Sequence, residues 1–317
     1  MFGTTRRRRR NGHSMLELGA TAVVAYGTFQ LARWAVSRLS RDRDQDLQLK
    51  HEVTQTLNQS FPSPQLQVDK QRVATLMIKS MPGIKTMTEE ATDCSYEVRQ
   101  LKVLRKQSTE ESRQEEQQMW NLMKRKSITR YLGMVYIHNA FLLIHILQTK
   151  YDDDLDAECS LDDDLQKNFP PQLFQLIEQA IDRRLQYWNV MQILDISHDE
   201  FVAGLSAVRW NVESSLFKIL IQDFEDKNHL SVVLQSPECQ LLWRQLNNNF
   251  FEFADAQVVR PIFVDQSVKT LIASLRGLKE CFTVFTPENE TYLSLLESEL
   301  SSPLTTRSLF QSIDQLD

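Results

Sequence analysis

Several side chains in this sequence could take part in catalysis or metal binding, but none stands in a pattern that such a site requires. His138 and His145 lie seven residues apart in one apolar stretch, so a helix places them on the same face. Two imidazoles do not complete a metal site, and we interpret both as core histidines. Ser206 follows Gly204 without the second glycine of a nucleophile elbow. The eight glycines lie too far apart for a phosphate loop or a dinucleotide motif.

An acidic segment and four cysteines are the other groups with possible chemistry. Residues 152–164 are rich in Asp and Glu, but they lack the order of acids and glycine that an EF-hand uses, so we expect a solvated loop. The cysteines are widely separated and indicate free thiols in a reducing compartment; they are Cys94, Cys159, Cys239 and Cys281. The sequence therefore predicts no enzyme, no cofactor, no metal and no small-molecule substrate.

Binding of another protein is the positive alternative. Met119, Trp120, Leu122 and Met123 stand at the start of a long apolar helix, directly after a polar segment. Aromatic and Met side chains line the grooves that accept amphipathic partner helices. The same residues would equally suit a helix core, so the sequence leaves both interpretations open.

The elements that must position these residues are all predicted to be helical. Gly is scarce, helix-forming residues are abundant, and no stretch shows the alternation of a strand. We expect one all-α bundle of long helices over residues 69–317. The predicted helices cover residues 69–81, 89–106, 118–150, 173–191, 201–221 and 238–257, followed by an apolar helical face from Val268 to Phe282.

Local signals predict where several helices begin and end. Pro82-Gly83 is expected to end the first helix, and Pro170-Pro171 to precede the fourth. Ser197 with Glu200 forms a capping box. Three Ser-Pro or Thr-Pro pairs are expected to supply an N-cap and a first-turn proline; these are Ser236-Pro237, Thr286-Pro287 and Ser302-Pro303.

The N-terminal 68 residues differ from the body in charge and hydropathy. Residues 1–50 contain ten Lys or Arg and four acids, whereas the whole chain has a formal net charge of −6. Residues 1–14 form a basic head, residues 15–34 an apolar stretch that is about long enough to cross a bilayer, and residues 35–68 a stalk and linker. The acidic body argues against nucleic-acid binding, and the basic head suggests contact with lipid headgroups. A targeting peptide and an interfacial helix remain alternatives for residues 15–34.

An ordered set of segments resembles the peroxin-3 family of peroxisomal membrane biogenesis factors. The segment Trp120-Asn-Leu-Met-Lys-Arg-Lys-Ser127-Ile-Thr-Arg130, which leads into the apolar helix, is similar to the family's central Trp, its Ser-Phe-Thr-Arg motif and its long helix. Leu76–Pro82 resembles a Leu-Ser-Met-Leu-Pro stretch of the family, and Ser236-Pro237-Glu238 resembles the start of a late helix. The sequence departs from the family pattern in two places. Residues 107–118 lengthen the run before Trp120, and the acidic loop stands where the family has a longer segment.

The resemblance implies a helical domain in the cytosol, anchored in the peroxisomal membrane, that receives the carrier peroxin-19 through that carrier's amphipathic N-terminal helix. The implied binding residues are Trp120, with Leu104, Met123 and Lys269 as further contacts, and the neighbouring Met119 at the helix start is a further candidate. It also places residues 1–14 on the matrix side, and we hypothesise that Arg6, Arg7, Arg8, Arg9 and Arg10 act as a targeting signal. The alternative is a membrane-anchored helical adaptor or tether of the mitochondrion or the endoplasmic reticulum.

Overall fold

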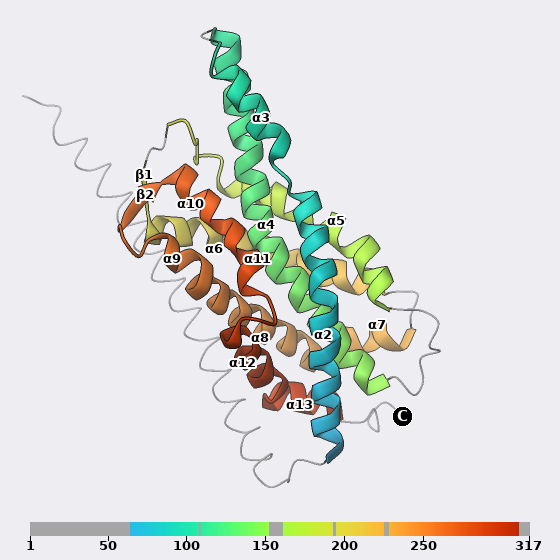
Figure 1. Cartoon of the computed structure of the whole chain (residues 1–317). Coiled ribbons are helices and arrows are strands. Elements are labelled where there is room, and N and C mark those ends of the chain that lie inside the picture. The colour runs from blue at the N-terminus through green and yellow to red at the C-terminus, as the bar shows by residue number, and fades with distance from the viewer. Residues whose placement is uncertain (1–63, 108, 152–160, 193–194, 225–227, 311–317) are drawn as a thin grey trace, which may run out of the picture. The chain divides into compact units, whose positions relative to one another are not determined.

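The computed structural model describes residues 64–107, 109–151, 161–192, 195–224 and 228–310. The chain divides into two compact units, Met1–Phe61 and Pro62–Asp317, and every described residue belongs to the second. The described residues are almost entirely helical, with two strands of three residues each, which confirms the predicted all-α class (Figure 1). The predicted basic head, the apolar stretch and the cluster Arg6–Arg10 lie outside the described residues.

The second unit contains the following elements. The first half comprises α2 (Pro64–Ala91), α3 (Ser95–Leu104), α4 (Glu110–Tyr151), α5 (Leu161–Arg184), β1 (Asp195–Ser197), α6 (His198–Gln222) and α7 (Asn228–Leu234). The second half comprises α8 (Pro237–Ala254), the π-helical turn η1 (Asp255–Val259), α9 (Arg260–Ile262), β2 (Val268–Thr270), α10 (Leu271–Gly277), the 3-10 turn η2 (Leu278–Glu280), α11 (Cys281–Val284), α12 (Glu290–Leu300) and α13 (Pro303–Phe310).

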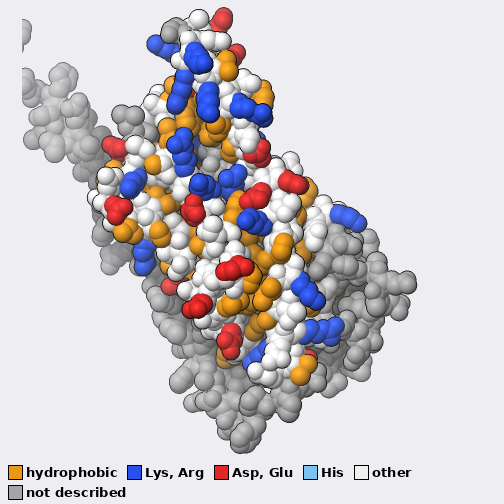
Figure 2. Space-filling model, viewed as in Figure 1, with side chains coloured by type: hydrophobic (Ala, Val, Ile, Leu, Met, Phe, Trp, Pro, Cys, Tyr) orange, Lys and Arg blue, Asp and Glu red, His pale blue; other side chains and the backbone are white. Residues whose placement is uncertain are grey.

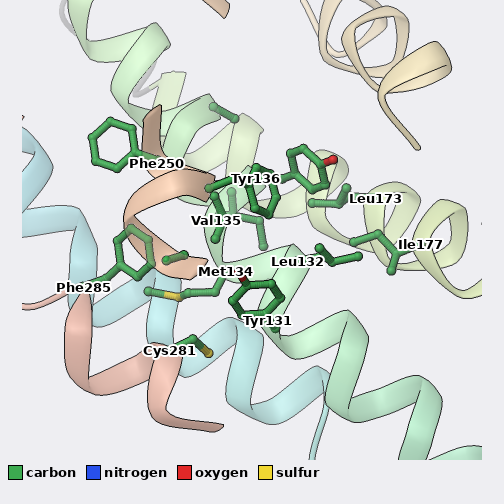
Figure 3. Close-up of a cluster of buried hydrophobic side chains, with 14 of the residues drawn as sticks. Tyr131, Leu132, Met134, Val135, Tyr136, Leu173, Ile177, Phe250, Cys281 and Phe285 are labelled. Atoms are coloured by element: carbon green, nitrogen blue, oxygen red, sulfur yellow. The ribbon is translucent and has the colours of Figure 1, made fainter. Parts of the chain in front are cut away.

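Helix α4 is the centre of this bundle. It contacts α2, α3, α5 and α8, and its residues from Tyr131 to Leu147 are buried on every side. Around Tyr131 and Val135, side chains converge from α5, α8 and the α11 region (Figure 3). Among the described helices, α4 is the one that is long and apolar enough to cross a membrane, and most of that apolar window is buried in protein. Helix α4 is therefore a core helix, as its His and Asn residues indicated.

The expected end of the first helix at Pro82-Gly83 is wrong, because α2 runs through both residues to Ala91. Its buried positions continue at helical spacing across the proline, from Val73 and Met77 to Ile84. Pro82 itself is exposed, so the carbonyl that its missing N–H leaves free can bind water. Packing of one continuous apolar stripe against α4 therefore outweighs the local cost of the proline.

Other helix boundaries in the structure also differ from the predicted ones. The second helix covers Ser95–Leu104 rather than residues 89–106, and α4 begins at Glu110 rather than at residue 118. Helix α5 begins at Leu161 and contains Pro170 and Pro171, which were expected to precede it. Its buried Leu165, Phe169 and Leu173 again keep a four-residue spacing through the prolines.

Helix starts that depend on a local hydrogen bond were predicted well. Ser197 and Glu200 form the expected capping box at α6, and Ser236 accepts from the Cys239 amide at α8. Ser302 likewise accepts from the Thr305 amide at 3.3 Å. The expected cap at Thr286 is wrong, because Asn289 caps α12 instead.

The apolar face predicted from Val268 to Phe282 is not one helix. Val268 belongs to β2, which pairs antiparallel with β1 so that Ile196 lies opposite Lys269. The remaining residues divide among α10, η2 and α11, whose Leu271 and Leu278 are buried. Three of the cysteines, Cys94, Cys239 and Cys281, are free thiols as predicted, whereas Cys159 lies outside the described residues.

The two histidines of α4 are core residues that hydrogen-bond to neighbouring helices. His138 bonds to Asn139 through Nδ1 and to the Tyr292 hydroxyl of α12 through Nε2 at 3.0 Å, and Asn139 donates to Asn247 of α8 at 2.9 Å. His145 bonds to the Ser80 hydroxyl of α2 at 3.0 Å. Within the described residues, no three His, Cys, Asp or Glu side chains are grouped so as to hold a metal ion.

Burial of His138 should make the protein less stable in mild acid. Desolvation lowers the pKa of His138 from 6.5 to about 4, so only the unfolded chain takes up this proton between these values. The neutral buried imidazole therefore contributes its full stabilisation of the folded state above the unfolded-state pKa, and this contribution is lost as the pH falls toward the folded-state pKa. We expect the free energy of unfolding to fall by about 2 kcal/mol between about pH 7 and about pH 5. Urea unfolding at both pH values measures the loss. His138→Gln should remove about that much of the pH dependence, whereas replacement of the more exposed His198 by Gln should retain it.

Candidate partner-binding site

Helices α3 and α4 pack against each other and place most of the predicted binding residues together. One face of α3 is buried through Glu97, Leu101 and Leu104, and this face packs on α4. The opposite face is solvated. Because Trp120 lies in the third turn of α4, the antiparallel return of the chain brings the end of α3 beside it.

Trp120 is covered by two charged side chains. The Arg105 guanidinium lies 5.3 Å from the centre of the indole ring. Its Nε donates to Glu116 Oε1 at 3.1 Å, and the Trp120 Nε1 donates to the same carboxylate oxygen at 3.3 Å. Trp120 is only 6% exposed, and it also belongs to the main cluster of buried hydrophobic residues. We call this Arg105–Glu116 pair the cover of Trp120.

The interactions that hold the cover over Trp120 contribute less free energy than the apolar packing around it. The Arg105 side chain is 57% exposed, and an ion pair at such a surface contributes about 0–1 kcal/mol. Stacking of an exposed guanidinium on an indole adds about 0.5–1 kcal/mol. Displacing Arg105 would uncover the ring face over which its guanidinium lies.

The other sequence-predicted residues are distributed unequally. Leu104 is buried at the same helix–helix contact, and Met119 and Met123 are half-buried against the core. Lys269 is half-buried on β2, opposite Ile196, and belongs to a different part of the unit. The structure therefore brings Leu104, Met119, Trp120 and Met123 to the two packed helices and places Lys269 on the small sheet.

Basic residues directly after Trp120 fix neighbouring segments onto α4, a role that the sequence analysis missed. Lys124 is 5% exposed and donates from Nζ to the carbonyls of Leu185 and Trp188, both at 3.0 Å, which satisfies groups at the end of α5. Burial lowers the pKa of Lys124. A lysine on an apolar helix, four residues after a buried Trp, was the signal that could have revealed this role.

Two further basic residues of α4 hold the turn between α2 and α3. Lys126 donates from Nζ to the Asp93 carbonyl at 2.6 Å and to Glu97 Oε1 at 2.7 Å. Arg130 donates to the Thr92 carbonyl at 2.6 Å and to its hydroxyl at 3.0 Å. These contacts fix the start of α3, and with it the position of Arg105 above Trp120.

The solvated face of α3 is basic and partly apolar. Tyr96 and Val103 are 57% and 51% exposed and lie two helical turns apart. Arg99, Lys102 and Lys106 run beside them at spacings of three and four residues. Figure 2 shows basic side chains gathered over α3. The solvated face of α3, which lies opposite its contact with α4, therefore attracts negative charge and offers apolar contact area.

No protein-family model matches this chain, and no curated protein matches it.

A cavity of about 850 Å³ that is open to solvent does not include Trp120. It lies between the end of α2, α4 and the η2–α11 segment, and is lined by Lys85, Glu89, Asp93, Arg130, Lys279 and Phe282, among others. Its charges are mixed in sign, and Arg130 is already bonded to Thr92. The covered indole is therefore the better candidate for a protein-binding site.

Proposed function

We propose that this protein is a membrane-anchored docking receptor of the peroxisome, and that its α3–α4 surface binds the amphipathic N-terminal helix of the carrier peroxin-19. The observation that carries the proposal is the position of Trp120. The indole lies beside the end of α3 under the cover of Arg105 and Glu116, and the solvated face of α3 adds basic and apolar side chains nearby in the chain. The resemblance of residues 120–148 to the peroxin-3 family names the partner.

Docking would take place by contact alone, without a chemical step. Basic residues on α3 attract the acidic edge of the arriving helix, Arg105 turns away, and the indole enters an apolar contact with the partner. Leu104, Met119 and Met123 surround that contact. Lys269 would add a distant contact if the partner extends as far as the small sheet.

The predicted membrane anchor would place the docking surface at a membrane. Residues 15–34 would hold the surface beside the bilayer, with residues 1–14 on the matrix side and the rest of the chain in the cytosol. A carrier that docks there releases its membrane-protein cargo at the bilayer into which the cargo inserts. The basic cluster Arg6–Arg10 would direct the chain to that membrane.

Localisation of the whole chain tests this function against an adaptor or tether of another organelle. A fluorescent fusion should coincide with peroxisomal markers. Coincidence with mitochondrial or reticular markers would favour the alternative.

Removal of the cover should strengthen binding of the carrier helix. Arg105→Ala abolishes both the ion pair and the ring contact, so the bound state no longer has to break them. We expect affinity to rise about fivefold, which corresponds to about 1 kcal/mol. Isothermal titration with the peroxin-19 N-terminal helix measures the change.

Arg99→Ala is the matched control, because Arg99 lies in α3, whose C-cap is Arg105, but donates to the Ser95 carbonyl rather than to Glu116. This variant should bind no more tightly than the wild type. Weaker binding by Arg105→Ala would show that Arg105 contacts the carrier and does not cover Trp120.

A further inference from the structure

The outward face of α3 carries cations without an exposed carboxylate. Glu97 is the one acid of this helix, and it is buried on the side toward α4, where its Oε1 lies 2.7 Å from Lys126 Nζ. Two exposed apolar side chains, Tyr96 and Val103, lie among the exposed basic ones. We call this set the α3 face; it consists of Tyr96, Arg99, Lys102, Val103 and Lys106, the last of which lies just beyond the C-cap.

The three cations of the α3 face are not neutralised by the fold. Arg99 donates to a backbone carbonyl of its own helix. Within the described part of the chain, neither Arg99 nor Lys102 nor Lys106 forms an ion pair. Three unpaired cations beside exposed apolar area suit an occupant that is acidic and carries some apolar side chains.

A single acidic segment fits this face better than an anionic bilayer does. Helix α4 begins beside the end of α3, and its first turns expose three carboxylates, Glu110, Glu111 and Glu115. A flat anionic surface would approach these carboxylates together with the cations of the α3 face, which costs free energy through like-charge repulsion. One chain segment can lie along α3 and avoid them.

The chain itself contains a segment of this chemistry directly after α4. Residues 152–160 include five acids and no base, with Leu155 and Ala157 between the acids. The segment lies outside the described residues, but both of its attachment points are described: α4 ends at Tyr151 and α5 begins at Leu161. The acids are Asp152, Asp153, Asp154, Asp156 and Glu158.

The segment cannot reach the α3 face of its own chain. The ion pair of Lys126 with Glu97 places the start of α3 about 38 Å from Tyr151 along the axis of α4, and the rest of α3 lies farther away. Helix α5 runs back along α4, with Asp182 bonded to Arg125, so its start also lies toward the far end. No residue of a nine-residue connection can lie more than about 18 Å from the nearer of its two ends.

We infer that the α3 face binds residues 152–160 of a second copy of this chain. The α3 face and the end of α4 lie toward opposite ends of this long helix (Figure 1). The contact is therefore head-to-tail, and each pair of copies retains one free face and one free segment. Such a contact builds open chains of subunits rather than closed dimers.

Self-association of this kind needs neither Trp120 nor the carrier, so it stands apart from the proposed docking function. The carrier would meet the same basic side chains, and the two would compete for the α3 face. Exposed ion pairs each contribute little free energy, so we expect weak association. If the chain is held on a membrane, the raised local concentration favours it.

Disulfide formation with the native Cys159, which belongs to the segment, tests the contact directly. Full chains that carry Val103→Cys should form a disulfide with Cys159 of the partner subunit under mild oxidation, and the products should extend beyond dimers. Cys159→Ser in the same chain should reduce the product at least about tenfold. Val268→Cys replaces a comparably exposed valine on β2 and should give no more product than the unsubstituted chain.

Reversal of charge on both sides of the contact tests its electrostatic origin. Lys102→Glu with Lys106→Glu should weaken self-association of the full chain in detergent at least about tenfold in sedimentation at low salt. Asp154→Lys with Asp156→Lys should have the same effect. An equal mixture of the two reversed chains should associate again, because reversed segments then meet reversed faces.

Reversal of two exposed cations elsewhere, Arg276→Glu with Lys279→Glu, is the matched control and should leave self-association unchanged. Three results would each overturn the inference: a chain that stays monomeric at low salt, crosslinking of Val103→Cys that does not need Cys159, or a mixture that associates no better than either reversed chain. Binding of a monomeric chain to phosphatidylserine vesicles through the two lysines would overturn it as well and would assign the α3 face to a bilayer.

Discussion

Trp120→Ala should weaken binding of the peroxin-19 N-terminal helix about 100-fold, which corresponds to about 2–3 kcal/mol. The indole is the largest apolar side chain where α3 packs on α4; Leu104 is buried at the same helix pair, and Met119 and Met123 are half-buried against the core. A partner side chain that packs on a rigid aromatic loses most of its contact when the ring is removed. Isothermal titration with the isolated carrier helix measures this loss.

The burial of Trp120 complicates the experiment, because Trp120→Ala also removes core contacts. With only 6% of the indole exposed, we expect a stability loss of about 3 kcal/mol in urea unfolding. Leu101→Ala is the matched control. Leu101 is 5% exposed and lies in the same contact between α3 and α4, and the bond that its carbonyl accepts from the Arg105 amide is a backbone bond that alanine retains.

The comparison of these two variants separates binding from folding. If Trp120 contacts the carrier, Leu101→Ala loses stability yet keeps its affinity within about threefold. Equal losses of affinity in both variants would show that binding requires an intact α3–α4 pair and not the indole itself. Unchanged affinity in Trp120→Ala would remove Trp120 from the binding site altogether.

Gly204→Ala should destabilise the protein by about 3 kcal/mol, a large effect for the addition of one methyl group. A Cβ at this position would lie 2.2 Å from Cζ2 of Trp188 and 2.6 Å from its Cη2. Trp188 cannot move away easily, because it is 2% exposed and stacks on Phe201 with ring centroids 5.5 Å apart. Its carbonyl also accepts from Lys124, so a displaced Trp188 would disturb α4 as well.

Gly83→Ala should instead stabilise the protein. Gly83 is exposed within α2, and the nearest atom to an added Cβ is the Gln166 amide nitrogen at 3.9 Å. Alanine there restricts the unfolded chain and favours helix, so stability should rise by about 0.5–1 kcal/mol. Urea unfolding of both variants checks the pair. A loss below about 1 kcal/mol for Gly204→Ala would mean that Trp188 has room to shift.

The fold class and several helix starts followed from local features of the sequence. The capping box at Ser197 and the Ser-Pro starts at positions 236 and 302 need only a side-chain oxygen and an amide within four residues. Such contacts form wherever the segment is placed. The core identity of α4 was also predictable, because its apolar residues surround the helix and its polar groups are too many for a lipid environment.

Helix boundaries near proline could not be predicted from local features of the sequence. Pro82, Pro170 and Pro171 each disfavour continued helix locally, yet α2 and α5 continue through them. The buried stripes on either side keep one register, and the free energy gained by burying them exceeds the local cost. The size of that gain depends on a partner surface that is distant in the sequence.

The sequence by itself determined that the chain is helical and that Trp120 belongs to a long apolar helix, beside two methionines and several basic residues. It left open whether the indole is core or binding surface. Only the tertiary structure placed Arg105 and Glu116 over the ring, the basic side chains against α3 and α5, and Lys269 on a separate sheet. Periodicity gives the face of a helix on which a residue lies, but what covers that face is decided by segments that meet only when the chain folds.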